Sequence, residues 1–306
     1  MAASMTGIYP SIAPSFLQAT RVVAVLLLGA LLCVPSSPAG AAKKPATEEM
    51  VFTLVRASDP ICEPNCPEWI AADGEITSKT TKAFKAILKK VGRRNLPLLI
   101  NSGGGRVDIA MAMGQIIRER QMTVEVARTD YLRCVPRDNK CKPDLQDGVY
   151  YGYANTTNAG CFSACPLVLA GGVRRIAGPV SRVGVHQIVT LSEKYRNKYK
   201  VWKVKNKSGK FVEKRKLIKR QKIGTTKSTK LSKKMRRELG KYFDDMGVKK
   251  TLIDLIVATP HEDIRILNVY ELKAYGLATE YWNMDVLVQF RVCTTSTPPA
   301  HCIVRE

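Results

Sequence analysis

A serine and a histidine in the middle of the chain could together perform acyl transfer. Ser163 lies in the segment "CFSACPLVLAGG", and His186, one of only three histidines, ends the segment "SRVGVH". A serine hydroxyl is a weak nucleophile until a positioned imidazole takes its proton, which is why this pair of residue types matters. Each residue also has an ordinary structural interpretation, the serine as a helix cap and the histidine as a packed core residue. Which interpretation holds, catalytic or structural, depends on the helices and strands that position the two residues.

The segments before Ser163 alternate between strand and helix patterns. Residues 50–57 and 69–77 are rich in β-forming residues, and 96–101, "LPLLIN", is an apolar strand followed by a glycine turn. Apolar side chains recur at helical spacing after the second and third of these strands, at Phe84, Ile87, Leu88 and Val91 and again at Ile109, Met113, Ile116 and Ile117. This alternation predicts an α/β fold with largely parallel strands.

Four segments of the chain carry a family likeness when they are taken in order. They are "IAADGEITSKTTKAFKAIL", "LLINSGGGRVDIAMAMGQIIRER", "CFSACPLVLAGGVRRIAGPVSRVGVHQ" and "ELKAYGLATEY". Together they resemble the proteolytic subunit of the Clp protease and its relatives in the Clp-protease/crotonase superfamily, and most closely exported Clp-like proteins of bacteria. The resemblance covers most of residues 69–281 and implies a spiral of ββα units, often assembled into rings. The predicted domain is 50–292, with a disulfide loop at 128–160 and a basic insertion at 193–230, followed by a cysteine-bearing tail, 293–306.

The resemblance places catalytic roles on three residues. Ser163 matches the family's nucleophile, and His186 matches its general base in the family's "IHQ" strand. The family's aspartate corresponds to Asp263 once one residue is inserted, and Glu262 is the nearest substitute. Such an aspartate orients the imidazole and stabilises its protonated form. The resemblance therefore implies a Ser163–His186–Asp263 triad.

The same resemblance implies an oxyanion hole. The turn Ser102-Gly103-Gly104-Gly105 matches the family's "SPGG", with Gly103 in place of the proline. Glycine lets a backbone amide approach a substrate closely, and the family uses amides of this turn as donors. The expected donors are the amides of Gly104 and Gly105, together with that of Ala164 beside the nucleophile.

The N-terminus has the pattern of a secretory signal. Arg21 precedes the apolar run Val22–Val34, and a small-residue site follows at Ala39-Gly40-Ala41. The run is short for a membrane-spanning helix, which needs roughly 20 apolar residues. We therefore expect residues 1–41 to be a signal peptide and the mature chain to be periplasmic or secreted. The alternative is an anchor in the inner membrane through residues 22–34.

Export determines how the cysteines are interpreted. Apart from Cys33 in the leader, eight cysteines remain and fall into close pairs, and an even number in an oxidising compartment predicts disulfides between neighbours. No pair has the CxxC spacing of a structural zinc site, so neither a metal nor a cofactor is expected. The predicted pairs are Cys62/Cys66, Cys134/Cys141, Cys161/Cys165 and Cys293/Cys302.

The net charge of +23 is concentrated in one part of the chain. Between Glu193 and Lys250 there are 23 Lys and Arg residues against five acidic ones. The first part of this region lacks apolar periodicity, which is typical of a surface insertion, and a flexible hairpin is one form that it could take. It is either a solvated basic loop or an arm that binds an anionic envelope surface. With an export signal present, nucleic acid is the least favoured partner.

Taken together, these expectations predict that the protein is an exported serine hydrolase. Its predicted substrates are peptides or unfolded proteins, cleaved through an acyl-enzyme at Ser163, and the resemblance also implies a homo-oligomer. Two other classes stay open: a non-catalytic envelope protein of the same fold that binds an anionic surface, and acyl-thioester chemistry of the crotonase kind. The last is less favoured, because those relatives usually lack a serine–histidine pair.

Overall fold

The computed structural model describes residues 48–305 apart from 133, 139, 142–147 and 282–286. The predicted signal segment, 1–41, lies outside the described residues. Within the described part of the chain, no helix has the length and apolar character needed to cross a membrane.

A main sheet forms the centre of the described chain. Its strands follow the order β5-β6-β1-β2-β3-β4-β8, and β13 pairs with β2. From β2 to β8 each strand runs parallel to the next, while β1 is antiparallel to β2. The strands are β1 (Val51–Ala57), β2 (Asn65–Asp73), β3 (Leu98–Asn101), β4 (Thr123–Val126), β5 (Arg128–Tyr131), β6 (Tyr150–Asn155), β8 (Arg174–Ile176) and β13 (Cys302–Val304).

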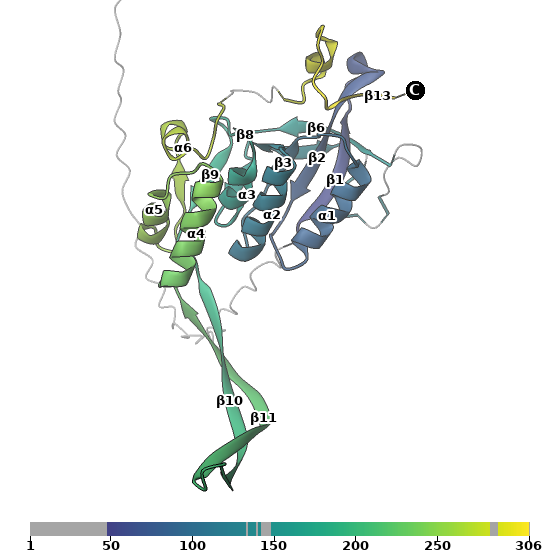
Figure 1. Cartoon of the computed structure of the whole chain (residues 1–306). Coiled ribbons are helices and arrows are strands. Elements are labelled where there is room, and N and C mark those ends of the chain that lie inside the picture. Colours follow the sequence, from purple (N-terminus) through teal and green to yellow (C-terminus); the bar gives the residue numbers. More distant parts are fainter. Residues whose placement is uncertain (1–47, 133, 139, 142–147, 282–286, 306) are drawn as a thin grey trace, which may run out of the picture. The chain divides into compact units, whose positions relative to one another are not determined.

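Helices cover one face of this sheet, because parallel neighbours need crossover connections. Figure 1 shows α1 (Thr80–Val91), α2 (Val107–Glu119) and α3 (Cys165–Gly171) side by side over the strands. Successive side chains of β3 lie on opposite faces of the sheet. Leu98 belongs to the core under the helices, and Leu99 belongs to a smaller apolar cluster on the opposite face. Such an arrangement confirms the α/β fold class.

Two segments that were predicted to be an inserted loop and a tail contribute strands to the main sheet. The predicted loop 128–160 contains β5 and β6, and β6 pairs in parallel with β1. The cysteine-bearing tail contains β13, which pairs with β2. A short 3-10 helix lies between β1 and β2, at Pro60–Cys62, and a second one precedes β13, at Phe290–Thr294. The sequence patterns of these segments are weak because their strands are short and partly exposed.

A second, three-stranded sheet carries the candidate site. It consists of β7 (Gly160–Phe162), β9 (Arg182–Val185) and β12 (Arg265–Leu267), in the order β12-β9-β7. Strands β7 and β9 are parallel, and β12 is antiparallel to β9. The carboxyl ends of β7 and β9 therefore meet at one edge of this sheet.

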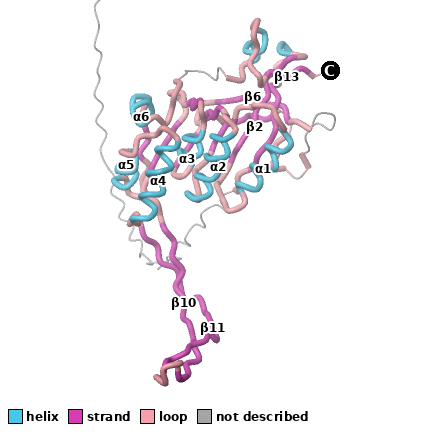
Figure 2. Tube along the Cα trace, viewed as in Figure 1, coloured by secondary structure: helices cyan, strands magenta, loops and turns pink. Residues whose placement is uncertain are grey.

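The basic insertion is a long two-stranded hairpin. Strands β10 (Thr190–Lys205) and β11 (Phe211–Ser228) pair antiparallel along their whole length, with irregularities in register beside Tyr195 and Tyr199. They form a sheet of their own, which Figure 2 shows as two long magenta strands. The prediction of a surface hairpin agrees with this structure.

Three helices follow the hairpin. Helix α4 (Lys233–Asp245) begins at Ser232, whose hydroxyl accepts a hydrogen bond from the Met235 amide at 3.1 Å. Helix α5 (Leu252–Ala258) ends before Thr259-Pro260, and α6 (Val269–Tyr275) begins with an Asn268/Glu271 capping box.

Helix α3 contacts both α2 and α4. A Cβ atom on Gly171 would lie 2.4 Å from the Gly114 carbonyl oxygen, so the two helices approach through glycines. From α4, the Tyr242 hydroxyl donates to the Leu167 carbonyl oxygen at 2.5 Å. Burial raises the pKa of Tyr242, which keeps its hydroxyl protonated as a donor. These contacts fix the helix that begins directly after Ser163.

Candidate active site

Ser163 occupies a sharp turn between a strand and a helix. It follows the last residue of β7, and Ala164 is the N-cap of α3. Its φ is 61°, a left-handed conformation that costs a non-glycine residue on the order of 1–2 kcal/mol. Its amide donates to the carbonyl oxygen of Gly184 in the neighbouring strand β9 at 2.9 Å. Strained strand-to-helix turns of this kind present a nucleophile's hydroxyl above a sheet.

A disulfide brackets the Ser163 turn. Cys161 lies in β7 and Cys165 is the first residue of α3; their Cα atoms are 5.1 Å apart and both residues are fully buried. Because Cys161 is still in the strand, helical geometry does not obstruct the bridge. The other three predicted pairs are bonded as well, at Cys62–Cys66, Cys134–Cys141 and Cys293–Cys302.

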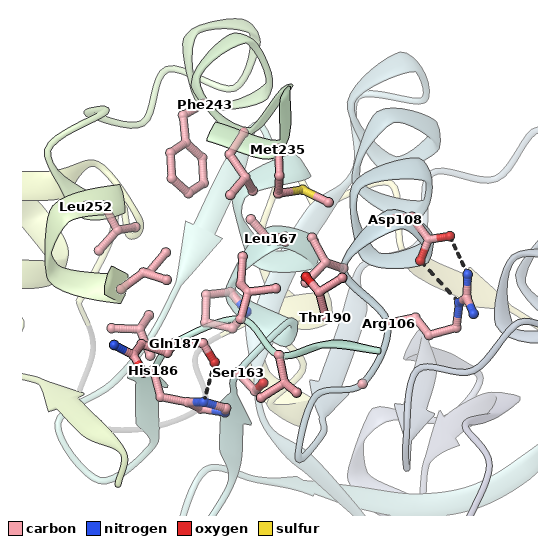
Figure 3. Close-up of a pocket in the computed structure, with 18 of the residues that line it drawn as sticks. Arg106, Asp108, Ser163, Leu167, His186, Gln187, Thr190, Met235, Phe243 and Leu252 are labelled. Carbon is pink, nitrogen blue, oxygen red and sulfur yellow. Dashed lines mark hydrogen bonds and ion pairs between the residues drawn. The ribbon is translucent and has the colours of Figure 1, made fainter. Parts of the chain in front are cut away.

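His186 lies beside Ser163 because their strands are parallel neighbours. Phe162 is paired with Gly184, so Ser163 and His186 both follow the carboxyl ends of adjacent strands. Figure 3 shows the imidazole of His186 next to the Ser163 side chain in one pocket, which both residues line. The structure thus brings the predicted nucleophile and base together.

The imidazole is oriented by a backbone carbonyl. His186 Nδ1 lies 2.9 Å from the carbonyl oxygen of Gln187 (Figure 3). A carbonyl oxygen can only accept, so Nδ1 carries the proton in this contact and Nε2 is left with its lone pair. That tautomer is the one a general base needs, since Nε2 can then take a proton from a hydroxyl.

The glycine turn packs directly against the serine. A Cβ atom on Gly104, whose φ is 104°, would lie 2.5 Å from Ser163 Cβ and 2.6 Å from the Phe162 carbonyl oxygen. The Gly104 amide donates to Ser102 Oγ at 3.1 Å. By contrast, the amides of Gly105 and Ala164 have no acceptor among the described residues. Of the three predicted oxyanion donors, these two have no partner among the described residues; Gly105 lines the pocket, whereas Ala164 is buried beside it.

Hydrogen bonds tie the glycine turn to β7. The Ser102 amide donates to the Gly160 carbonyl oxygen at 2.7 Å, and the Phe162 amide donates back to the Ser102 carbonyl oxygen at 3.0 Å. The Asn101 side-chain oxygen accepts from the Gly160 amide at 2.9 Å. Buried Ser102 also donates through its hydroxyl to the Gly74 carbonyl oxygen at 2.6 Å. The amides and the serine are therefore parts of one connected backbone unit.

Asp263 lies near the pair without touching the imidazole. It is exposed in the segment before β12, the strand that pairs with β9. In the part of the chain that the structure describes, its carboxylate has no hydrogen bond or ion pair, and the Gln187 carbonyl occupies the contact at His186 Nδ1. Glu262, the nearest substitute, is paired with His261 at 2.8 Å. The triad role of Asp263 stays a prediction.

An apolar pocket of about 560 Å³ opens beside Ser163 and His186. Its apolar wall comes from α3, α4 and α5, and Figure 3 shows Leu167, Met235, Phe243 and Leu252 pointing into it. The remaining apolar side chains from these three helices in the wall are Pro166, Leu239 and Ile256.

Charged groups of the pocket lie at the start of α2. The guanidinium of Arg106 donates to the Asp108 carboxylate at 2.6 Å, and this hydrogen bond holds the pKa of Asp108 below its usual range. Both side chains are more than half exposed. No cluster of three or more His, Cys, Asp or Glu side chains suited to a metal ion occurs among the described residues.

Sequence reasoning missed several parts of the site. Met235, Leu239 and Phe243 recur at helical spacing, which indicates a helix with an apolar face, but no signal in the sequence shows that this face covers the pocket. The role of the Gln187 carbonyl cannot be recognised in the sequence, because every residue has a main-chain carbonyl. Ser102 was noted only as part of the glycine turn, although its hydroxyl anchors that turn.

No protein-family model and no curated protein matches the chain. Similar solved structures include a mutant of a membrane-bound stomatin-specific protease, with 14% identity over 70% of this chain and 78% of that chain and a TM-score of 0.39. ClpP1 from Listeria monocytogenes has 14% identity over 70% of this chain and 91% of that chain, with a TM-score of 0.38. The ClpP catalytic domain from Plasmodium falciparum has 14% identity over 70% of this chain and 83% of that chain, with a TM-score of 0.36.

Proposed function

We propose that the chain is a serine hydrolase that cleaves peptide bonds through an acyl-enzyme at Ser163. The observation that carries this proposal is the position of Ser163, in a strained left-handed turn beside the imidazole of His186 in one pocket. A serine that only caps a helix has an extended backbone conformation. The strain at Ser163 has no such purpose and is typical of residues that the surrounding structure holds in place for chemistry.

The chemistry follows from the groups around the serine. Nε2 of His186 accepts the proton from Ser163 Oγ as the oxygen attacks the carbonyl carbon of the substrate. The negative charge that develops on the carbonyl oxygen is stabilised by the amides of Gly105 and Ala164. The imidazolium then donates its proton to the leaving amine, and an acyl-enzyme remains. A water molecule, deprotonated by the same imidazole, hydrolyses the ester and restores Ser163.

The pocket favours an apolar side chain next to the bond that is cleaved. Its wall beyond Ser163 is made by apolar residues of α3, α4 and α5, and its volume of about 560 Å³ admits a large side chain. A charged side chain among these apolar residues would lose its hydration, and the charged groups of the pocket, Arg106 and Asp108, are already paired with each other. We therefore expect cleavage beside large apolar residues such as leucine or phenylalanine.

An oxidising compartment fits this function. All eight described cysteines are joined in four disulfides, a state that persists in exported proteins. The leader predicted at residues 1–41 points the same way. The resemblance of the sequence to Clp proteolytic subunits makes peptides or unfolded chains the expected substrates, and subunit rings the expected assembly.

Labelling by a fluorophosphonate probe tests the proposal, because the probe bonds only to an activated serine. Wild-type protein should be labelled, Ser163→Ala should not, and His186→Gln should react at least about a thousandfold more slowly. Ser78→Ala, which removes an exposed hydroxyl outside the pocket, is the matched control and should be labelled like wild type. A folded wild-type protein that no probe labels, or a Ser163→Ala variant that is still labelled, would refute the assignment.

A further inference from the structure

The two faces of the β10–β11 hairpin differ in how their charges are compensated. The hairpin from Thr190 to Ser228 carries 15 Lys and Arg residues against two acidic ones. In an antiparallel pair, residues directly opposite each other lie on the same face, and successive residues alternate between faces. Lys207 and Lys210 lie in the turn between the strands, and the observed register assigns each of the other 13 cations to one face.

One face satisfies most of its cations within the hairpin. The Arg220 guanidinium stacks 3.8 Å from the centre of the Tyr195 ring, and Arg215 lies 6.0 Å from the centre of the Tyr199 ring. Lys222 forms an ion pair with Glu193. Contacts of this kind reduce the repulsion among neighbouring positive charges.

The opposite face, here called the lysine face, has no such compensation. No acidic residue lies on it, and in the described chain none of its seven cations has an ion pair or a ring contact. Lys198 stands directly opposite Lys219, and Lys200 directly opposite Lys216, arrangements that destabilise a sheet. The lysine face consists of Lys194, Arg196, Lys198 and Lys200 from β10 and Lys214, Lys216 and Lys219 from β11.

An apolar group continues the lysine face toward the tip of the hairpin. Trp202 is paired with Lys214, and Val204 is paired with Val212 on the same face. Trp202 is 39% exposed and Val212 is 38% exposed. Tryptophan is enriched at the boundary between lipid headgroups and acyl chains, where its ring is partly buried and its N–H is hydrated.

We propose that the lysine face docks on the surface of an anionic phospholipid bilayer. The seven cations would lie among lipid phosphates, which relieves the repulsion between Lys198 and Lys219 and between Lys200 and Lys216. Trp202, Val204 and Val212 would enter the interfacial layer, as the apolar side chains of peripheral membrane proteins do. A soluble polyanion would neutralise the cations but leave the paired valines in water, and the disulfides favour a compartment without nucleic acid.

The proposal is independent of the hydrolase chemistry. The lysine face contains none of the residues of the candidate active site, so a Ser163→Ala protein should bind lipid like wild type. Hairpin docking and labelling of Ser163 can therefore fail separately.

Binding of the full chain to vesicles of phosphatidylcholine, with and without phosphatidylglycerol, tests the proposal. The N-terminal apolar run can bind both kinds of vesicle, so the difference in affinity between vesicles with and without phosphatidylglycerol is the quantity that reports on charge. We expect this difference to fall steeply with salt. The triple variant Lys198→Gln, Lys200→Gln, Lys216→Gln should bind the anionic vesicles about a hundredfold more weakly, since each basic residue near such a surface contributes about fivefold.

A matched variant separates a specific face from general positive charge. Lys203→Gln, Lys205→Gln and Arg215→Gln remove the same charge from the opposite face of the hairpin. That variant should lose less than about fivefold, whereas attraction by net charge alone would weaken both variants equally. Equal losses, or no dependence on anionic lipid in the wild-type protein, would overturn the proposal. Tighter binding to a double-stranded DNA oligonucleotide than to anionic vesicles at equal phosphate concentration would assign the face to nucleic acid instead.

Discussion

Ser163 is fixed on both sides by covalent and steric constraints, whereas His186 is oriented by one hydrogen bond to a main-chain carbonyl. The serine turn is bracketed by the buried Cys161–Cys165 disulfide and packed against Gly104 without room for a Cβ atom. The imidazole of His186 is partly exposed and contacts the Gln187 carbonyl.

This difference follows from what each residue needs. A left-handed serine would relax to an ordinary conformation unless the chain on both sides were held, because the strain disfavours it by on the order of 1–2 kcal/mol. An imidazole in a relaxed strand end needs only the correct tautomer and direction, and one acceptor at Nδ1 supplies both. Changes around Ser163 should therefore reduce activity much more than changes around His186.

The largest effect is expected from Gly104→Ala. The new Cβ would lie 2.5 Å from Ser163 Cβ and 2.6 Å from a main-chain oxygen, in a backbone conformation that L residues rarely adopt. We expect a loss of about 2–4 kcal/mol in the free energy of unfolding, from overpacking and the positive φ together. Displacing the hydroxyl by even about 1 Å should slow fluorophosphonate labelling by at least a hundredfold. Urea denaturation and labelling kinetics measure the two effects.

Gly103→Ala is the matched control for this change. No atom lies within 4 Å of a Cβ placed at Gly103, and its φ is not positive. We expect labelling within about threefold of wild type, as for most surface substitutions. If both variants were labelled normally, close packing between the glycine turn and Ser163 would not position the nucleophile.

A smaller effect is expected when the Cys161–Cys165 bridge is replaced by two alanines. The Cys62–Cys66 bridge is a matched control, with the same sequence separation of four and a similar Cα distance of 4.8 Å. Both double variants should lose about 2 kcal/mol of stability, because the loops are equally short. Only the Cys161/Cys165 variant should also lose activity, by roughly ten- to a hundredfold, as the turn relaxes. Equal labelling rates in the two variants would show that the bridge stabilises the fold without positioning Ser163.

The sequence predicted the parts of the site that depend on residue type and order. Ser163 and His186 were singled out because a hydroxyl and an imidazole are distinctive side chains and match the motifs of the resembled family, and the structure places both in the lining of one pocket. The four cysteine pairs were predicted because neighbours in the chain can bridge. The fold class followed from alternating strand and helix periodicity, which reflects local burial.

What the sequence could not predict are features set by long-range packing. The covering of the pocket by α4 and α5 depends on how the chain returns after a 39-residue hairpin, and periodicity gives only the apolar face. The occupied amide of Gly104 depends on the rotamer of Ser102. The acceptor at His186 Nδ1 is a main-chain atom, which no sequence motif marks, so the resemblance pointed instead to a carboxylate, Asp263.

Asp263→Asn tests the histidine side and should have the smallest effect. If the Gln187 carbonyl orients the imidazole, removing a nearby exposed charge should slow labelling by less than about tenfold. If an aspartate held the imidazole in a triad, replacing it by asparagine would slow the reaction about 10⁴-fold, because the asparagine amide stabilises the wrong imidazole tautomer. Glu262→Gln, which removes the neighbouring charge, is the control for general electrostatics. A labelling rate that falls a thousandfold or more in Asp263→Asn alone, with the fold intact, would contradict this expectation. It would mean that Asp263 replaces the Gln187 carbonyl at His186 when substrate binds, so that His186 is then held as firmly as Ser163.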